Sequence, residues 1–450
     1  MSNVFAMREI QITADELVLS LLELSKQRQV CFLDSCAVSH LGSHLLIAGI
    51  EPIETLNVSN KNPSDTLELF NQKLSQPDSV CIFTISYDFG LKLENIVPRE
   101  KEFPAFPEPD IFLAVFDCLI IHDYNTRKTY IAGNKKKFDK TEEDLFNSAD
   151  SENFENSGNS KTASNFTRES YISTVEKIQE FIRRGDTYQT NLTQRIRAQL
   201  PENLTAQKIF WSLRKSHPAP FAAFIKRDNN FVVSISPERF LKVQSPRSEV
   251  QSRIVSTSPI KGTRPRGKNK TEDDLLRNEL LESAKDRAEN VMIVDLLRND
   301  IGRICEFGSV KVEKLCDLET HPTLFHLVST VSGKLLEDIN YADIIKAVFP
   351  CGSITGAPKI RTMQIINRLE TVNRGLSMGA IGYCLMENGK WKMENKFDMN
   401  VAIRTMVIRG NEAVFNVGGG IVIDSIPENE YAESLLKAQA LLKAINGKLK

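Results

Sequence analysis

A lysine that could act as a nucleophile lies in the stretch SPIKGTRPRG, residues 258–267. Pro259 restricts the backbone before Lys261, Gly262 frees it afterwards, and the stretch has no helical period. We therefore expect Lys261 at a strand end or in a tight loop. A lysine amine is a covalent nucleophile when burial or neighbouring charge keeps it neutral. A solvated lysine in a basic loop is the alternative, because two arginines follow it.

Two predicted helices could each offer carboxylates to a metal ion. The first carries Glu289 at the edge of a run of apolar residues. The second begins with a predicted capping box at Ser425 and carries Glu430, Glu433 and Lys437 on one face. An exposed ladder of salt bridges is the simpler interpretation of that face. Carboxylates from both helices could instead bind Mg²⁺, which takes one or two protein carboxylates and leaves positions for substrate oxygens.

Two further features could bind an anion. Three successive glycines, Gly418, Gly419 and Gly420, follow a predicted strand, so their backbone N–H groups could approach a ligand closely. Arg404 lies among apolar residues of another predicted strand and needs an acidic partner. Either a ligand carboxylate or a structural Asp or Glu would satisfy it.

The bulk composition limits the classes of function. The chain has 450 residues, with 57 basic and 58 acidic side chains and a formal net charge of -1. This balance gives no electrostatic footprint for nucleic acid, and no apolar run is long enough to span a membrane. The cysteines form no C-x-x-C pair, and charged residues interrupt the N-terminus in a way that a signal peptide does not. We therefore expect a cytoplasmic protein without nucleic-acid or membrane partners.

The sequence divides into three predicted parts. Residues 1–134 form an N-terminal region, residues 135–165 a flexible polar linker that is poor in aliphatic side chains, and residues 166–450 the main domain. In the main domain β-hairpins alternate with amphipathic helices, which predicts an α+β fold. The clearest elements are helices at 15–26 and 168–184, strand-like runs at 80–89 and 111–121, and hairpins at 221–236, 387–390 and 401–417.

Eight motifs occur in an order and spacing that resemble the chorismate-utilising enzymes. They are SPERFL (236–241), PIKGT (259–263), KDRAENVMIVDLLRNDIGR (285–303), HLVSTVSG (326–333), GSITGAPK (352–359), AIRT (402–405), GGGIV (418–422) and PENEYAES (427–434). Residues 1–134 look more loosely like the N-terminal region of component I of anthranilate and aminodeoxychorismate synthases. The resemblance implies a large β-sandwich of antiparallel sheets flanked by helices, with a chorismate-binding catalytic domain at 166–450 that packs with the N-terminal region.

The resemblance also implies roles for the candidate residues. Glu289 and Glu433 would hold Mg²⁺ against a carboxylate of chorismate, with Glu430 close by or acting through water. Glu238 would be the general acid, and Lys261 would be the nucleophile. The groups that orient the substrate would be Arg404, the amides around Gly419 and Gly420, Lys437, Thr263 and His326.

The residue at position 261 separates branches of the family. Lysine in the PIKGT motif is typical of the branch that aminates chorismate at C4, whereas the anthranilate-forming branch usually has alanine. Gln189 stands where water-adding members typically carry a lysine base. The resemblance therefore implies 4-amino-4-deoxychorismate as the product, in the p-aminobenzoate and folate pathway. An anthranilate-forming component I, and a catalytically silent chorismate-binding or glutaminase-activating subunit, are the alternatives.

The resemblance also concerns partners and a second ligand. The chain shows no glutaminase region with its own cysteine and histidine, so ammonia is expected from a separate glutaminase subunit in a heterodimer. Leu33-Asp34-Ser35 resembles a motif that holds tryptophan in some relatives, with aspartate in place of glutamate.

Overall fold

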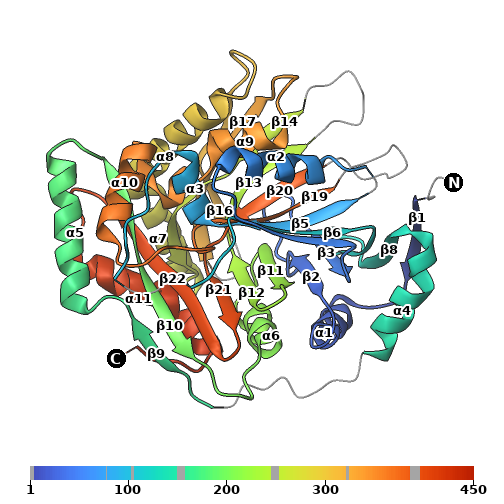
Figure 1. Cartoon of the computed structure of the whole chain (residues 1–450). Helices are drawn as coiled ribbons and strands as arrows, with labels where there is room; N and C mark the ends of the chain where they lie inside the picture. The colour runs from blue at the N-terminus through green and yellow to red at the C-terminus, as the bar shows by residue number, and fades with distance from the viewer. Residues whose placement is uncertain are drawn as a thin grey trace.

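Two large antiparallel sheets dominate the structure, a computed structural model that describes residues 5–77, 79–102, 106–148, 158–244, 253–320, 324–385 and 396–449. One apolar cluster contains side chains from both sheets. Cys31 and Val232 come from the first sheet, and Ile82 and Phe112 come from the second. The sheets therefore pack against each other, and helices surround them (Figure 1). The predicted α+β class, with a β-sandwich flanked by helices, is confirmed.

The first sheet contains twelve of the described strands. In spatial order they are β1 (Phe5–Ile10), β8 (Lys128–Asn134), β7 (Cys118–Asp123), β3 (Leu45–Ile50), β2 (Val30–Asp34), β11 (Phe221–Lys226), β12 (Phe231–Ser236), β21 (Thr405–Arg409), β22 (Glu412–Ile421), β10 (Gln189–Gln199) and β18 (Gly356–Ala357), with β9 (Lys161–Ser164) also paired to β10. The predicted hairpin at 221–236 is confirmed as β11–β12, and the one at 401–417 is confirmed as β21–β22 from Thr405 onward. Its predicted start at Val401 is wrong, because Val401 ends β20 of the second sheet.

The second sheet contains ten of the described strands. In spatial order they are β15 (Ile260–Pro265), β17 (Leu324–Lys334), β14 (Ile254–Thr257), β13 (Arg239–Gln244), β20 (Lys396–Val401), β19 (Ala380–Leu385), β5 (Val80–Ile85), β6 (Ile111–Phe116) and β4 (Glu54–Val58), with β16 (Lys311–Thr320) also paired to β17. The hairpin turn predicted at 387–390 lies outside the described residues.

The N-terminal region contributes strands to both sheets. The run at 111–121, which reads as one strand, breaks at Asp117, so β6 belongs to the second sheet and β7 to the first. Residues before 135 and after 165 therefore share both sheets. The domain boundaries themselves stay a prediction.

Helices cover the outer faces of the sheets. The helices are α1 (Ala14–Leu24), α2 (Pro63–Leu74), α3 (Tyr87–Leu93), α4 (Phe138–Asn147), α5 (Arg168–Arg183), α6 (Ala206–Ser216), α7 (Lys270–Glu282), α8 (Ala284–Gly302), α9 (Tyr341–Val348), α10 (Lys359–Leu369) and α11 (Pro427–Ala444), with short 3-10 turns η1 (Lys135–Lys137) and η2 (Gly352–Ile354). Helices α1, α4, α6 and α11 bury apolar side chains on the first sheet, and α2, α3, α8 and α9 on the second. Within the described residues, no helix combines the length and the apolar character needed to cross a membrane.

Helix α4 lies where the sequence predicts a flexible linker, and that prediction is wrong for residues 138–147. Phe138 is 1% exposed and Leu145 is fully buried. These two apolar side chains lie on the same face of α4 and pack it against the first sheet. Arg8 adds ion pairs to Asp139 and Glu142 at 2.7 and 2.9 Å. The average composition of residues 135–165 is polar, so it gives no sign of the apolar stripe on this helix.

Two crossovers join the sheets close to each other in space. The chain passes from β12 to β13 through residues 237–238, and from β20 to β21 through residues 402–404. The Val401 amide donates a hydrogen bond of 3.1 Å to the Glu238 carbonyl oxygen, which ties the crossovers together. Both crossovers carry a predicted site residue.

Candidate active site

Lys261 lies on β15, the edge strand of the second sheet, and not in a solvated loop. Its side chain is half-buried. It lies close enough to Glu238, Glu289 and Glu433 to favour the ionised form of each carboxylate. The structure therefore brings the predicted nucleophile, the predicted acid and two predicted metal ligands together.

Glu238 occupies the first crossover and is only 6% exposed. Among the described residues its Oε1 has no hydrogen-bond partner. Burial raises the pKa of the Glu238 carboxyl, and the Ser353 hydroxyl and Lys261 oppose that rise. A carboxyl that holds its proton to higher pH and has an uncommitted oxygen is suited to general acid catalysis.

The predicted metal-binding carboxylates lie on two helices, Glu289 on α8 and Glu430 and Glu433 on α11. Burial raises the pKa of Glu289, and the nearby Glu433 carboxylate adds to the rise. Burial also raises the pKa of Glu430. Burial acts in the same direction on Glu433, but the Lys437 ammonium 2.7 Å away gives its pKa a net lowering. The helices thus hold like charges close together, and Lys437 compensates the charge of Glu433 in part.

Ser425 does not cap α11, and the capping box predicted there is wrong. The N-cap is Ile426, which makes no side-chain hydrogen bond. The Ser425 hydroxyl donates instead to Glu430 Oε1 at 2.7 Å and accepts from the Val422 amide at 3.1 Å. A buried carboxylate accepts a stronger hydrogen bond than a helix N–H provides, so the serine orients a site residue.

Gly419 makes room for the carboxylate cluster. A Cβ built on it would lie 3.2 Å from Glu430 Oε2, 3.7 Å from Lys437 Nζ and 3.8 Å from Glu433 Oε1. Lys437 also donates a hydrogen bond of 3.0 Å to the Gly418 carbonyl oxygen. The glycine run therefore lies directly beneath the charged groups of α11.

Gly420 makes room for a different side chain. A Cβ built on it would overlap Gln189 Nε2 of the neighbouring strand β10. Gln189 is 1% exposed, and among the described residues its Oε1 has no hydrogen-bond partner. Gly420 thus permits a buried amide beside the carboxylate cluster.

Arg404 occupies the second crossover with a backbone φ of 48°, a left-handed conformation that is rare for a side chain of this size. Burial lowers the pKa of its guanidinium. In the part of the chain that the structure describes, no carboxylate forms an ion pair with it. Of the two partners left open by the sequence, this favours a ligand carboxylate over a structural one.

Thr263 and His326 face each other across β15 and β17. Thr263 is exposed, His326 is 6% exposed, and Glu319 of β16 pairs with His326 from the other side. Their register places both in the strand pair that carries Lys261. The substrate-binding roles expected for them stay predictions.

Two polar residues near the site were missed in the sequence. Lys285 favours the ionised forms of Glu289, Glu430 and Glu433, so it lies within electrostatic reach of all three. Its i,i+4 spacing from Glu289 was the available signal. Ser353 of η2 acts on Glu238, and only its place in the GSITGAPK motif could have indicated it.

The donor set is compatible with a hard divalent cation. Carboxylate oxygens are the ligands that Mg²⁺ prefers, and two like charges from separate helices are relieved by a cation between them. Among the described residues, no three His, Cys, Asp or Glu side chains form a complete metal site by themselves. A site with two carboxylates, completed by water and substrate oxygens, fits both observations.

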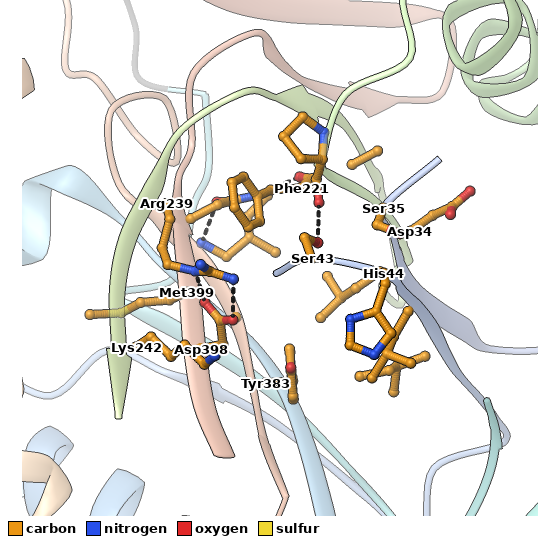
Figure 2. Close-up of a pocket in the computed structure, with 18 of the residues that line it drawn as sticks. Asp34, Ser35, Ser43, His44, Phe221, Arg239, Lys242, Tyr383, Asp398 and Met399 are labelled. Atoms are coloured by element: carbon orange, nitrogen blue, oxygen red, sulfur yellow. Dashed lines mark hydrogen bonds and ion pairs between the residues drawn. The ribbon is translucent and has the colours of Figure 1, made fainter. Parts of the chain in front are cut away.

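A separate hollow lies between the sheets near the predicted tryptophan motif (Figure 2). Arg239 binds Asp398 through two hydrogen bonds of 3.0 Å, and its guanidinium lies 4.9 Å from the centre of the Phe221 ring. Asp34 accepts hydrogen bonds from Arg214 Nε and from the Tyr124 hydroxyl, both at 2.7 Å. The acidic groups of this hollow are therefore already neutralised by the protein.

Comparison with protein families matches residues 28–443 to the chorismate binding enzymes. Aminodeoxychorismate synthase component 1 of Bacillus subtilis is 34% identical over 373 residues, which cover 80% of this chain and 76% of that protein. Anthranilate synthase component 1 of Aquifex aeolicus is 37% identical over 365 residues, covering 75% and 70%. The crystal structure of anthranilate synthase component I from Streptococcus pneumoniae superposes with a TM-score of 0.75 and 28% identity, covering 90% of this chain and 93% of that one. The chain therefore belongs to the chorismate binding enzyme family, as an enzyme of the aminodeoxychorismate and anthranilate synthase type.

Proposed function

We propose that the chain aminates chorismate at C4 to give 4-amino-4-deoxychorismate, with Mg²⁺ as cofactor. The observation that carries this proposal is Lys261, a half-buried amine among the carboxylates of Glu238, Glu289 and Glu433. A nucleophile at this position can form a covalent intermediate, which splits one difficult displacement into two easier ones. The similarity to aminodeoxychorismate synthase component 1 supports the same reaction.

Glu289 and Glu433 would hold the metal, with Glu430 close by and fixed by Ser425. Bound there, Mg²⁺ would neutralise a carboxylate of chorismate. Arg404, which has no carboxylate partner in the described part of the chain, would bind the other substrate carboxylate in a bidentate fork. Further orientation would come from the amides near Gly419 and Gly420, Lys437, Thr263 and His326.

The amination would proceed in two balanced displacements. The amine of Lys261 bonds to C2, the ring double bond moves, and the C4–O bond breaks as Glu238 gives its proton to the departing hydroxyl, which leaves as water. Ammonia then bonds to C4, the double bond returns, the C2–N bond to Lys261 breaks, and a proton from the new C4 ammonium returns to Glu238. Chorismate and ammonia are thus converted into 4-amino-4-deoxychorismate and water, and the lysine is regenerated.

Ammonia would come from a separate glutaminase subunit in a heterodimer. The name of the Bacillus subtilis relative, component 1, supports a second component. The product would feed p-aminobenzoate and folate synthesis after release of p-aminobenzoate by another enzyme.

Formation of anthranilate is the second candidate, because relatives with that name are equally similar. Incubation with chorismate, Mg²⁺ and ammonia at high pH, followed by mass and fluorescence analysis, distinguishes the candidates. We expect 4-amino-4-deoxychorismate without pyruvate. Fluorescent anthranilate with pyruvate would contradict the proposal, and tight chorismate binding without turnover would indicate a silent subunit. In Lys261→Ala we expect C4 amination to be lost; an unchanged product and rate would exclude the lysine as nucleophile.

A further inference from the structure

The strand that carries Lys261 contains a bulge at that residue. Ile260 faces Val328 of β17, and Thr263 faces His326, so two residues of β15 oppose the single residue between those partners. The second residue of the bulge, Gly262, has a φ of 84°. A bulge of this kind turns its first side chain out of the regular alternation of the strand. The direction of the Lys261 side chain therefore depends on the conformation of Gly262.

Helices α7 and α8 pack directly against the bulge. A Cβ on Gly262 would lie 2.9 Å from Leu280 Cδ1 and 3.0 Å from Asp286 Cβ, so there is no space for a side chain. Leu280 is fully buried near the end of α7. Asp286 lies in the first turn of α8, where its amide donates to Ser283 Oγ at 3.2 Å. The bulge is therefore seated at the junction of the two helices.

Arg264 fastens the strand to both helices. Its Nε donates to Glu279 Oε1 of α7 at 2.8 Å, and its Nη2 donates to Asp286 Oδ2 of α8 at 3.3 Å. Its Nη1 also donates to the Thr263 carbonyl oxygen at 3.0 Å. One guanidinium thus links the strand end, the end of α7 and the start of α8.

Asp286 and Glu289 are three residues apart on α8, so they lie on the same helix face. Asp286 packs beside Gly262, and Glu289 interacts electrostatically with Lys261. We propose that Arg264 and Asp286 are positioning residues, which set the bulge against α8 and thereby hold the Lys261 amine in register with Glu289. Their role in turnover rests on the proposed function, whereas their effect on the orientation of Lys261 does not.

The test uses Arg264→Gln and, as a second variant that keeps the side-chain shape, Asp286→Asn. Arg266→Gln is the matched control, because Arg266 forms its bidentate pair with Asp273 of α7, at 2.8 and 2.7 Å. Misplacement of a reacting group by about 1 Å costs on the order of 100-fold in rate. We expect kcat for C4 amination to fall about 10–100-fold in Arg264→Gln, with the KM for chorismate and the melting temperature almost unchanged. The double variant should be little slower than Arg264→Gln, because both single substitutions weaken the same contact between Arg264 and Asp286.

A second measurement does not depend on turnover. Acetylation of Lys261 by acetic anhydride, followed by peptide mass spectrometry, reports how the amine is held. We expect the labelling rate to rise several-fold in Arg264→Gln and Asp286→Asn and to stay at the wild-type value in Arg266→Gln. Equal labelling and equal kcat in all three variants would overturn the positioning role. Anthranilate formation by the wild type would overturn the proposed function alone, and the labelling comparison would still decide the inference.

Discussion

Gly419→Ala is expected to disturb the carboxylate cluster without disturbing the fold. The added methyl would lie 3.2 Å from Glu430 Oε2, closer than an ordinary van der Waals contact of 3.4–4 Å. Glu430 cannot simply turn away, because Ser425 holds its other oxygen at 2.7 Å. The methyl also approaches Lys437 Nζ and Glu433 Oε1 at 3.7 and 3.8 Å. The cluster must therefore shift by a few tenths of an ångström.

Disturbing the groups around a metal ligand typically costs about 10–100-fold in affinity or activity, which corresponds to about 1.4–2.8 kcal/mol. We expect the Mg²⁺ concentration for half-maximal rate to rise by about that factor, measured at saturating chorismate and ammonia. Gly302→Ala is the control, because a Cβ there meets no described atom within 4 Å apart from its chain neighbours and the nearby backbone of its own helix. An unchanged Mg²⁺ midpoint in Gly419→Ala, or an equal rise in the control, would refute the reasoning.

Three other predictions concern single side chains. Glu238→Gln should lower kcat by about 100- to 10,000-fold. Because burial raises the Glu238 pKa, the pH–rate profile of the wild type should show activity falling as pH rises through that pKa. Thermal melts should show that the stability of the wild type relative to the variant falls as pH rises from about 4 to the raised pKa. Arg404→Met should raise the KM for chorismate at least tenfold, since a charge-assisted bidentate contact is lost, and an unchanged KM would argue against substrate contact. The melting temperature should not fall, because the variant removes a half-buried charge that desolvation disfavours. Phe138→Ala should lower the free energy of unfolding by about 3–5 kcal/mol in urea titration, and a loss below about 1 kcal/mol would mean that α4 is not packed on the sheet.

Much of the architecture follows from local pattern. Helix α5 begins at the predicted cap, Thr167, because its hydroxyl accepts from the Ser170 amide, and the β11–β12 hairpin follows from alternating apolar residues. Local pattern failed where tertiary contacts decided the outcome. Phe138 orders a segment whose average composition is polar, and Ser425 leaves the predicted cap for a buried carboxylate.

The candidate site was likewise predictable from local pattern only in part. Glu430 and Glu433 share a helix face, so spacing alone could group them, but their approach to Glu289 depends on how α8 and α11 pack on different sheets. The bulge at Lys261 arises from the register of β15 against β17, so the only local signal for it in the sequence is Gly262. The spacing of Lys285 from Glu289 does not by itself predict a site residue, because a lysine in the first turn of a helix usually points into solvent.

The most direct test of the account is the mass of the Lys261 peptide after incubation with chorismate and Mg²⁺ in the absence of ammonia. We expect an adduct on Lys261 equal to chorismate less one water, which disappears when ammonia is added and 4-amino-4-deoxychorismate forms. We also expect no adduct when Lys261 is replaced by alanine. Formation of 4-amino-4-deoxychorismate by a protein whose Lys261 never carries an adduct, including after rapid quenching, would contradict the central claim.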